Sequence, residues 1–248
     1  MVEFRMSWTI VSGGHMQDVY FWNMQLLQVV RAAIQERVSL LKRLVFLSLI
    51  GIGLLALRVI MPVDRSFLFL LWNFFLATVP LLISMCLRVY SRRSGFLQIL
   101  PWLLLWLVFF PNAPYMLTDY RHLQGSYGFG FIIDCLSIFY FAIIAFIVSV
   151  ISLSDIRSIL VNFMGKWAII AISIVVILSG FGIFIGRDMR YNSWDIFSKP
   201  GEVLMKSFNG FFNFHSNYWT VLASGLISVL LLVAVMVYDR RMKGVREI

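Results

Sequence analysis

The sequence predicts an all-α fold, a polytopic transmembrane helix bundle of about six spans with both termini in the cytoplasm. Hydrophobic residues make up 60% of the 248 residues, and charged residues only 13%. Several apolar runs approach the roughly 20 residues that a helix needs to cross a bilayer. Pro111 and Pro114 interrupt one run and predict a broken helix there, because proline donates no backbone hydrogen bond.

Charged or turn-forming residues bound each apolar run and set the limits of the predicted spans. The spans are expected at about Leu44–Met61, Phe67–Leu87, Phe96–Phe110, Phe129–Ile151, Trp167–Gly186 and Trp219–Val237. The chain then divides into a cytoplasmic N-terminal segment (1–43), a six-span membrane domain (44–238) and a basic cytoplasmic tail (239–248).

The distribution of Lys and Arg predicts the orientation, since these residues are retained on the cytoplasmic side. With both ends inside, most of the 21 basic residues fall on that side, around 31–43, 88–93, 157–166 and 240–246. A basic inner face suits anionic lipid headgroups, so the net charge of +9 needs no nucleic-acid partner. Membrane lipids are therefore the expected partners.

An amphipathic helix is predicted before the first span, lying on the inner membrane surface. Apolar residues recur there at helical spacing, at Leu26, Val30, Ile34, Val38 and Leu41. Such a helix anchors a protein to the membrane, and a regulatory role is the alternative.

Two polar side chains, Asn73 and Asp134, lie inside predicted spans. Each is about six residues from the outer end of its span, which corresponds to a depth of roughly 9 Å. They are expected to face each other across the bundle and to look into an outward cavity. The alternative is that each ties helices together by a hydrogen bond.

The segment FFPNAPYMLTDYRHL, residues 109–123, places polar groups at the membrane edge after the helix break. If the chain coils again beyond Asn112, then Tyr115, Asp119 and His122 share one helical face. An acid beside an imidazole can orient it for proton transfer, which makes Asp119 and His122 a candidate acid/base pair. The alternative is that they cap or solvate a surface turn. The sequence has no Cys/His cluster of the zinc type, and no metal or other cofactor is expected.

The segment GFGIFIGRDMRYNSWDIFSKP, residues 180–200, is expected on the same outer face. Arg187 and Arg190 are one helical turn apart and can hold a phosphate or carboxylate from one side. Alternatively, they pair with Asp188 and Asp195 or touch lipid headgroups. Asn192 and Asp195 have the spacing of a partial capping box at a helix start.

These two segments, together with LWNFFLATVPLLIS, resemble the bacterial membrane proteins grouped as domain of unknown function 1361. The similarity runs from about Leu44 to Tyr238. The polar signature of the family falls on Asn73, Pro111, Asn112, Pro114, Tyr115, Thr118, Asp119, His122, Arg187, Asn192, Ser193, Trp194 and Asp195. The resemblance implies a multi-pass protein of the bacterial cytoplasmic membrane, and it implies no activity.

The sequence thus predicts one composite site on the outer side. The expected ligand-binding residues are Asn73, Asn112, Tyr115, Asp134, Arg187, Arg190, Asn192 and Asp195. The first hypothesis is binding or translocation of a small or lipid-linked anionic or zwitterionic ligand. The second is a membrane-embedded hydrolase or transferase that uses Asp119 and His122. The third is a structural subunit that packs with other membrane subunits through glycine faces such as Gly182 and Gly186.

Overall fold

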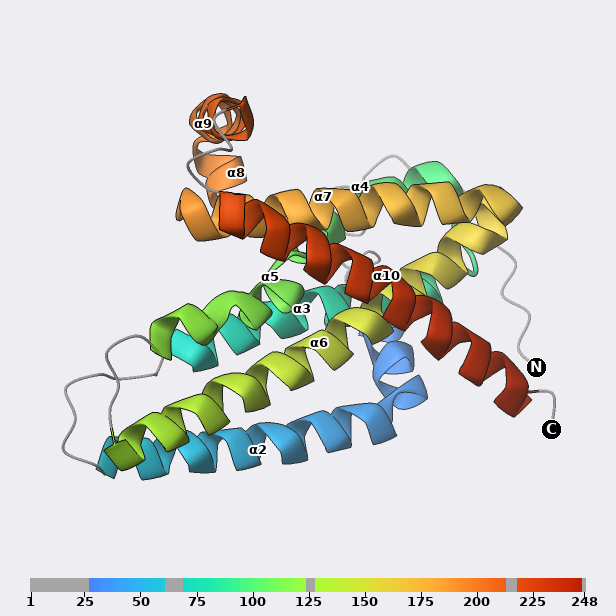
Figure 1. The fold of residues 1–248 in the computed structure, drawn as a ribbon. Helices are drawn as coiled ribbons and strands as arrows, with labels where there is room; N and C mark the ends of the chain where they lie inside the picture. The colour runs from blue at the N-terminus through green and yellow to red at the C-terminus, as the bar shows by residue number, and fades with distance from the viewer. Residues whose placement is uncertain (1–26, 61–68, 124–127, 213–217, 247–248) are drawn as a thin grey trace, which may run out of the picture.

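The computed structural model describes residues 27–60, 69–123, 128–212 and 218–246. These residues form α-helices and short 3-10 helices, which confirms the all-α class (Figure 1). The elements are α2 (Val38–Ile60), α3 (Phe69–Tyr90), α4 (Phe96–Phe109), α5 (Asn112–Tyr115), η1 (Met116–Leu123), α6 (Gly128–Met164), η2 (Gly165–Trp167), α7 (Ala168–Asp188), α8 (Asp195–Ser198), α9 (Pro200–Phe212) and α10 (Tyr218–Arg246).

Five stretches of the described chain are long and apolar enough to cross a membrane, so the chain is a multi-pass membrane protein. They are Val38–Leu57, Phe69–Tyr90, Phe96–Leu123, Gly130–Asp188 and Tyr218–Arg241. The fourth stretch holds both α6 and α7. Gly165 joins these helices with a φ of +55°, a conformation that glycine adopts without strain. The chain turns back at this point, as Figure 1 shows.

The helix limits differ from the expected spans most clearly in α6, which has 37 residues and continues past the expected end at Ile151. The last part of α6 carries several polar side chains, and the predicted span therefore ended before them. Ser152 and Asp155 are nevertheless buried, because neighbouring helices surround them. Tertiary contacts therefore extend this helix beyond the length that the apolar run predicts.

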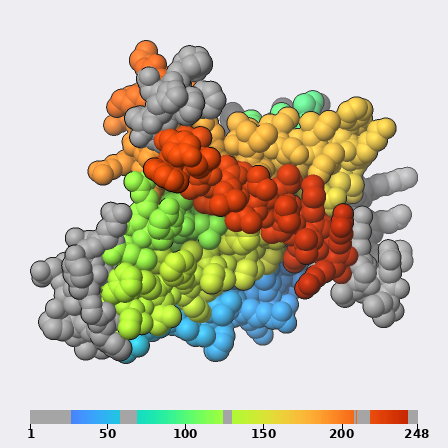
Figure 2. All heavy atoms as spheres, in the orientation of Figure 1, coloured from blue at the N-terminus to red at the C-terminus, as the bar shows by residue number. Residues whose placement is uncertain are grey.

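Helix α6 lies at the centre of the bundle and packs against α2, α3, α7 and α10. One core cluster joins it to α2 and α3, with Phe74 and Phe141 in edge-to-face contact. A second cluster joins it to α4, α7 and α10 around Trp106 and Ile172. Figure 2 shows α2, α6 and α10 side by side on one face of the molecule.

In the predicted N-terminal segment (1–43), the structure describes a helix over residues 27–36, and residues 1–26 lie outside the described ranges. Glu36 at its end accepts hydrogen bonds from both terminal nitrogens of Arg92, at 2.5 and 2.9 Å. A turn at Arg37 separates this helix from α2, which begins at Val38, six residues before the expected first span. The segment is therefore docked onto the end of α3.

Ion pairs cluster at the end of the bundle where α2 begins and α10 ends (Figure 1). The carboxylate of Asp155 accepts hydrogen bonds from Arg37 and, at 2.9 Å, from Arg88. Asp239 accepts hydrogen bonds from Arg157 and Ser154. These pairs connect α3, α6 and α10 to the turn before α2. The opposite end of the bundle holds α5, η1, α8 and α9, and the candidate site lies there.

Candidate functional site

The proline-interrupted segment begins the site. Helix α4 ends at Phe109 and α5 starts at Asn112, so the helix breaks where the prolines predict. The backbone stays close to helical across Pro111, with φ −59° and ψ −22°. The amide of Asn112 donates a hydrogen bond to the carbonyl oxygen of Phe109 at 2.8 Å. This side chain satisfies a carbonyl group at the break, as buried backbone requires.

The chain does coil again, but as the 3-10 helix η1 from Met116 onward. A 3-10 helix has three residues per turn, so the α-helical face expected for Tyr115, Asp119 and His122 does not hold there. His122 packs its ring near Phe69, with ring centroids 4.6 Å apart. Asp119 is fully buried and turns toward two other helices.

Arg187, in the last turn of α7, connects α7 to α5 and η1. Its guanidinium donates hydrogen bonds to the carbonyl oxygen of Thr118 at 2.6 Å, to the Tyr115 hydroxyl at 3.2 Å and to the Asp119 carboxylate at 3.4 Å. The side chains of Arg187 and Asp119 are only 8% and 1% exposed. Arg187 thus pairs with Asp119 of η1, and not with Asp188 or Asp195 as the sequence suggested.

Asn73 also contacts this cluster, because its amide donates a hydrogen bond to Asp119 at 3.3 Å. The sequence placed Asn73 opposite Asp134. The structure instead joins α3 to η1 through Asp119. Asp134 is fully buried in α6, and the described residues that line the pocket do not include it.

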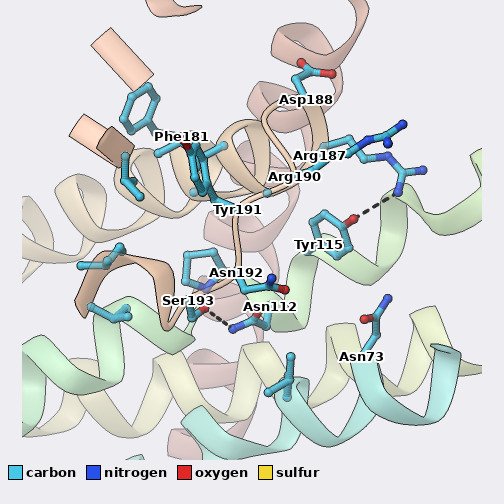
Figure 3. Close-up of a pocket in the computed structure, with 18 of the residues that line it drawn as sticks. Asn73, Asn112, Tyr115, Phe181, Arg187, Asp188, Arg190, Tyr191, Asn192 and Ser193 are labelled. Carbon is cyan, nitrogen blue, oxygen red and sulfur yellow. Dashed lines mark hydrogen bonds between the residues drawn. The ribbon is translucent and has the colours of Figure 1, made fainter. Parts of the chain in front are cut away.

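A pocket of about 950 Å³ opens above this cluster (Figure 3). Its volume lies near the top of the range of about 300 to 1,000 Å³ that is usual for small-molecule sites. Its uncharged polar lining comes from α3, α5 and the segment after α7. These residues are Asn73, Asn112, Tyr115, Tyr191, Asn192 and Ser193.

The charged side chains of the pocket are mostly positive. Arg121, Arg187 and Arg190 line it, and Asp188 is the one carboxylate among the described lining residues. Asp188 lies 4.0 Å from Arg121 and accepts a hydrogen bond from Thr220 at 3.1 Å. In the part of the chain that the structure describes, no carboxylate lies within salt-bridge distance of Arg190.

Arg190 follows the end of α7 with a φ of 58°, in the left-handed region. Helices often end with such a residue, and the position favours glycine or asparagine over a side chain like arginine. This turn reverses the chain toward Asn192 and Ser193, which then reach α5. The Asn112 amide donates a hydrogen bond to the Ser193 hydroxyl at 2.8 Å, drawn in Figure 3.

Asn192 and Asp195 form half of the capping box that their spacing predicts. The Asp195 carboxylate accepts a hydrogen bond from the backbone N–H of Asn192 at 2.7 Å, at the start of α8. Asn192 lines the pocket, whereas Asp195 holds the turn that positions it. The contact of Asp195 is therefore the capping contact that the spacing predicts.

Helix α9 lies at the same end of the bundle as the site, and Val203 in it lines the pocket. Glu202 accepts hydrogen bonds from Lys206 at 2.7 Å and from the Tyr191 hydroxyl at 2.9 Å. These two donors lower the pKa of Glu202 below its usual value, the Lys206 bond having the larger effect. The contact to Tyr191 ties α9 to the segment after α7.

Gly182 allows the broken helix to approach α7. A Cβ atom at Gly182 would lie 2.6 Å from Cγ of Pro111, closer than real contacts permit. A Cβ atom at Gly186 would meet the Tyr115 ring at 3.5 Å, an ordinary contact. Gly182 and Gly186 are four residues apart on the same helix, but only Gly186 has room for a methyl group.

We expect Gly182→Ala to lower the free energy of unfolding by about 1 to 3 kcal/mol, because the rigid Pro111 ring must move. Thermal unfolding of the purified protein in detergent measures this. Gly186→Ala is the matched control and is expected to be neutral or to stabilise α7, since alanine is the better helix former. Equal stability of the two variants would show that the close approach of Pro111 is not required.

Several pocket residues carry no clear signal in the sequence. In the sequence, Arg121 resembles a surface charge, Asp188 a partner for the neighbouring arginines, and Tyr191 a turn residue. Their place in the pocket follows from the meeting of η1 with the end of α7. Ser193 had one signal, its place in the polar signature of the family. Among the described residues, no three His, Cys, Asp or Glu side chains come together as a metal site.

Comparison with known protein families agrees with the segments singled out in the sequence. A family model, described as a protein of unknown function (DUF1361), matches residues 72–235. The match contains α4 to α9 and hence most of the pocket, while α2 precedes it. No curated protein and no solved structure matches the chain. The family match covers well over half of the sequence, and the chain therefore belongs to the DUF1361 family.

Proposed function

We propose that this protein is a six-span protein of the bacterial cytoplasmic membrane whose extracytoplasmic pocket binds the anionic group of a small or lipid-linked ligand. The observation that carries the proposal is the set of three arginines, Arg121, Arg187 and Arg190, around one pocket whose described lining has a single carboxylate. Guanidinium groups match phosphate and carboxylate oxygens in geometry and in charge.

The six-span topology is supported by the reversal of the chain at Gly165. Helices α6 and α7 have 37 and 21 residues, so each is long enough to cross the hydrocarbon core. Six crossings put the two ends of the membrane domain on one side. That side carries Arg37, Arg88 and Arg157, which the positive-inside rule assigns to the cytoplasm.

Within this proposal the arginines have different roles. Arg187 is buried and already donates to Tyr115, Thr118 and Asp119, so its guanidinium is held in place at the floor of the pocket as one half of an ion pair. Arg190 is exposed, has no carboxylate partner among the described residues and can turn toward a ligand. Asn192 lines the same pocket and can donate further hydrogen bonds, whereas both amide hydrogens of Asn112 are already donated to Phe109 and Ser193.

The enzyme hypothesis needs Asp119 to reach a substrate. The described lining of the pocket includes His122 but not Asp119, which accepts hydrogen bonds from Asn73 and Arg187. We therefore assign Asp119 the role of holding Arg187. The subunit hypothesis invoked glycine faces, and Gly180 and Gly182 pack against Ser228 and Pro111 of the same chain. Binding is thus the function that these contacts favour.

Binding is tested with butyl phosphate as a soluble probe and the purified protein in phosphatidylcholine nanodiscs. We expect Arg190→Asn to weaken binding about tenfold, because a hydrogen bond to a charged group contributes about 1.5 to 3 kcal/mol. Asparagine tolerates the left-handed backbone at this position, so the turn is retained. Calorimetric titration gives the dissociation constants.

Lys199→Gln is the matched control, since it removes an exposed positive charge from the same end of the bundle outside the pocket. It is expected to leave binding unchanged. Equal affinity of wild type and Arg190→Asn, or no binding by wild type, would refute the proposal.

The side of the membrane is tested by labelling single cysteines with an impermeant maleimide on intact cells. Ser198→Cys and Gly95→Cys are placed in a background in which Cys86 and Cys135 are replaced by alanine. Both sites are exposed, and a Cβ atom at Gly95 meets no other atom within 4 Å. We expect labelling of Ser198→Cys alone. Labelling of Gly95→Cys alone would place the pocket in the cytoplasm.

A further inference from the structure

We infer that the ligand of this pocket is an anionic amphiphile, whose charged head lies at the arginines and whose hydrocarbon chain lies between α4 and α7, open to the bilayer. The inference rests on the proposed function and specifies its ligand class. It starts from the shape of the pocket, which is polar at one end and apolar at the other.

The apolar end is built from two candidate membrane spans. Leu107 and Val108 line it from α4, and Leu178, Phe181 and Ile185 line it from α7. Leu178 precedes Arg187 by nine residues, so the pocket follows α7 for about 13 Å at the helical rise per residue. Figure 3 shows Phe181 on the side of the pocket away from Arg187 and Tyr115.

The apolar end is open to the surface of the bundle. Leu178 lines the pocket and is 44% exposed. Ile174 and Ile177 beside it on α7 and Leu104 on α4 are also exposed. Because α4 and α7 belong to apolar stretches of membrane-spanning length, this surface faces lipid. A hydrocarbon chain can enter from the bilayer here without crossing water.

A small hydrated anion uses only the polar end of such a pocket. The apolar end offers it no hydrogen-bond partner, and transfer of a polar group to that environment is unfavourable. An amphiphile uses both ends, because its head meets the arginines while its chain contacts Val108, Leu178 and Phe181. The separation of charged and apolar lining along one pocket therefore selects an amphiphile over a soluble anion.

The test compares butyl phosphate with dodecyl phosphate, in phosphatidylcholine nanodiscs, for wild type and for Leu178→Trp. The indole fills the apolar end, so the preference for the dodecyl over the butyl probe is expected to fall at least tenfold. Partition of dodecyl phosphate into the bilayer raises its local concentration equally for every variant, and it cancels in the comparison.

Ile177→Trp is the matched control. It adds the same indole at the neighbouring position, which is 69% exposed and faces away from the described pocket lining. It is expected to keep the wild-type preference. Val108→Trp blocks the same end from α4 and serves as a second blocking variant if Leu178→Trp does not fold.

Two results separate this inference from the proposed function. If the dodecyl preference is the same in wild type, Leu178→Trp and Val108→Trp, the amphiphile inference fails. Butyl phosphate binding that still depends on Arg190 would then leave the proposed function in place. If neither probe depends on Arg190, the proposed function itself fails.

Discussion

Arg187→Gln is expected to lower the free energy of unfolding by about 3 to 5 kcal/mol, because it leaves the buried carboxylate of Asp119 without its charged partner. Arg187 also donates to the Thr118 carbonyl and the Tyr115 hydroxyl, so α7, α5 and η1 lose a shared contact. Thermal unfolding in detergent and the affinity for butyl phosphate are the two measurements. Both are expected to decrease in this variant.

A double-mutant cycle separates the ion pair from the other contacts. Asp119→Asn keeps the shape of the side chain and removes its charge. The double variant Arg187→Gln/Asp119→Asn is expected to be more stable than Arg187→Gln alone, since no uncompensated charge remains. A double variant whose loss equals the sum of the two single losses would show that the pair contributes no coupling.

Asp155→Ala is the second change with a large expected effect, at the opposite end of the bundle. The Asp155 side chain is 2% exposed and holds Arg37 and Arg88, whose side chains are 20% and 29% exposed. Removing the carboxylate leaves two guanidinium groups without their partner. We expect a loss of about 3 kcal/mol, at the low end for buried pairs because both arginines can reach water.

Glu36→Ala is the matched control for this prediction. Its pair with Arg92 is also at this end of the bundle, but the two side chains are 34% and 53% exposed. Exposed pairs contribute about 0 to 1 kcal/mol, so little change is expected. Equal losses for Asp155→Ala and Glu36→Ala in thermal unfolding would mean that the buried cluster is not what joins α3 and α6.

The broken helix illustrates what can be predicted from sequence. Pro111 and Pro114 lack a donor whatever surrounds them, and two prolines three residues apart predict the interruption after Phe109. Single prolines do not interrupt the helices here, since Pro80 and Pro101 lie inside α3 and α4. The capping contact between Asn192 and Asp195 is likewise local, since three residues separate the partners. Such features depend on neighbours in the chain and need no knowledge of the fold.

The partners of Asp119 illustrate what cannot be predicted in this way. Helical spacing placed Asp119 on one face with His122, whereas its carboxylate meets Asn73 of α3 and Arg187 of α7, 46 and 68 residues away. The same holds for Gly182, whose close neighbour Pro111 comes from another helix. No periodicity within one segment carries information on these distant contacts.

The sequence by itself determined that this protein is a helical, multi-pass membrane protein, where one helix breaks and which segments hold polar groups. These properties follow from the free energy of transferring side chains to lipid and from the geometry of proline. Only the tertiary structure decided that α3, η1 and α7 meet, that Asp119 holds Arg187, and that the pocket has a charged and an apolar end. Those contacts depend on how separate helices pack against one another, and packing is a property of the whole bundle.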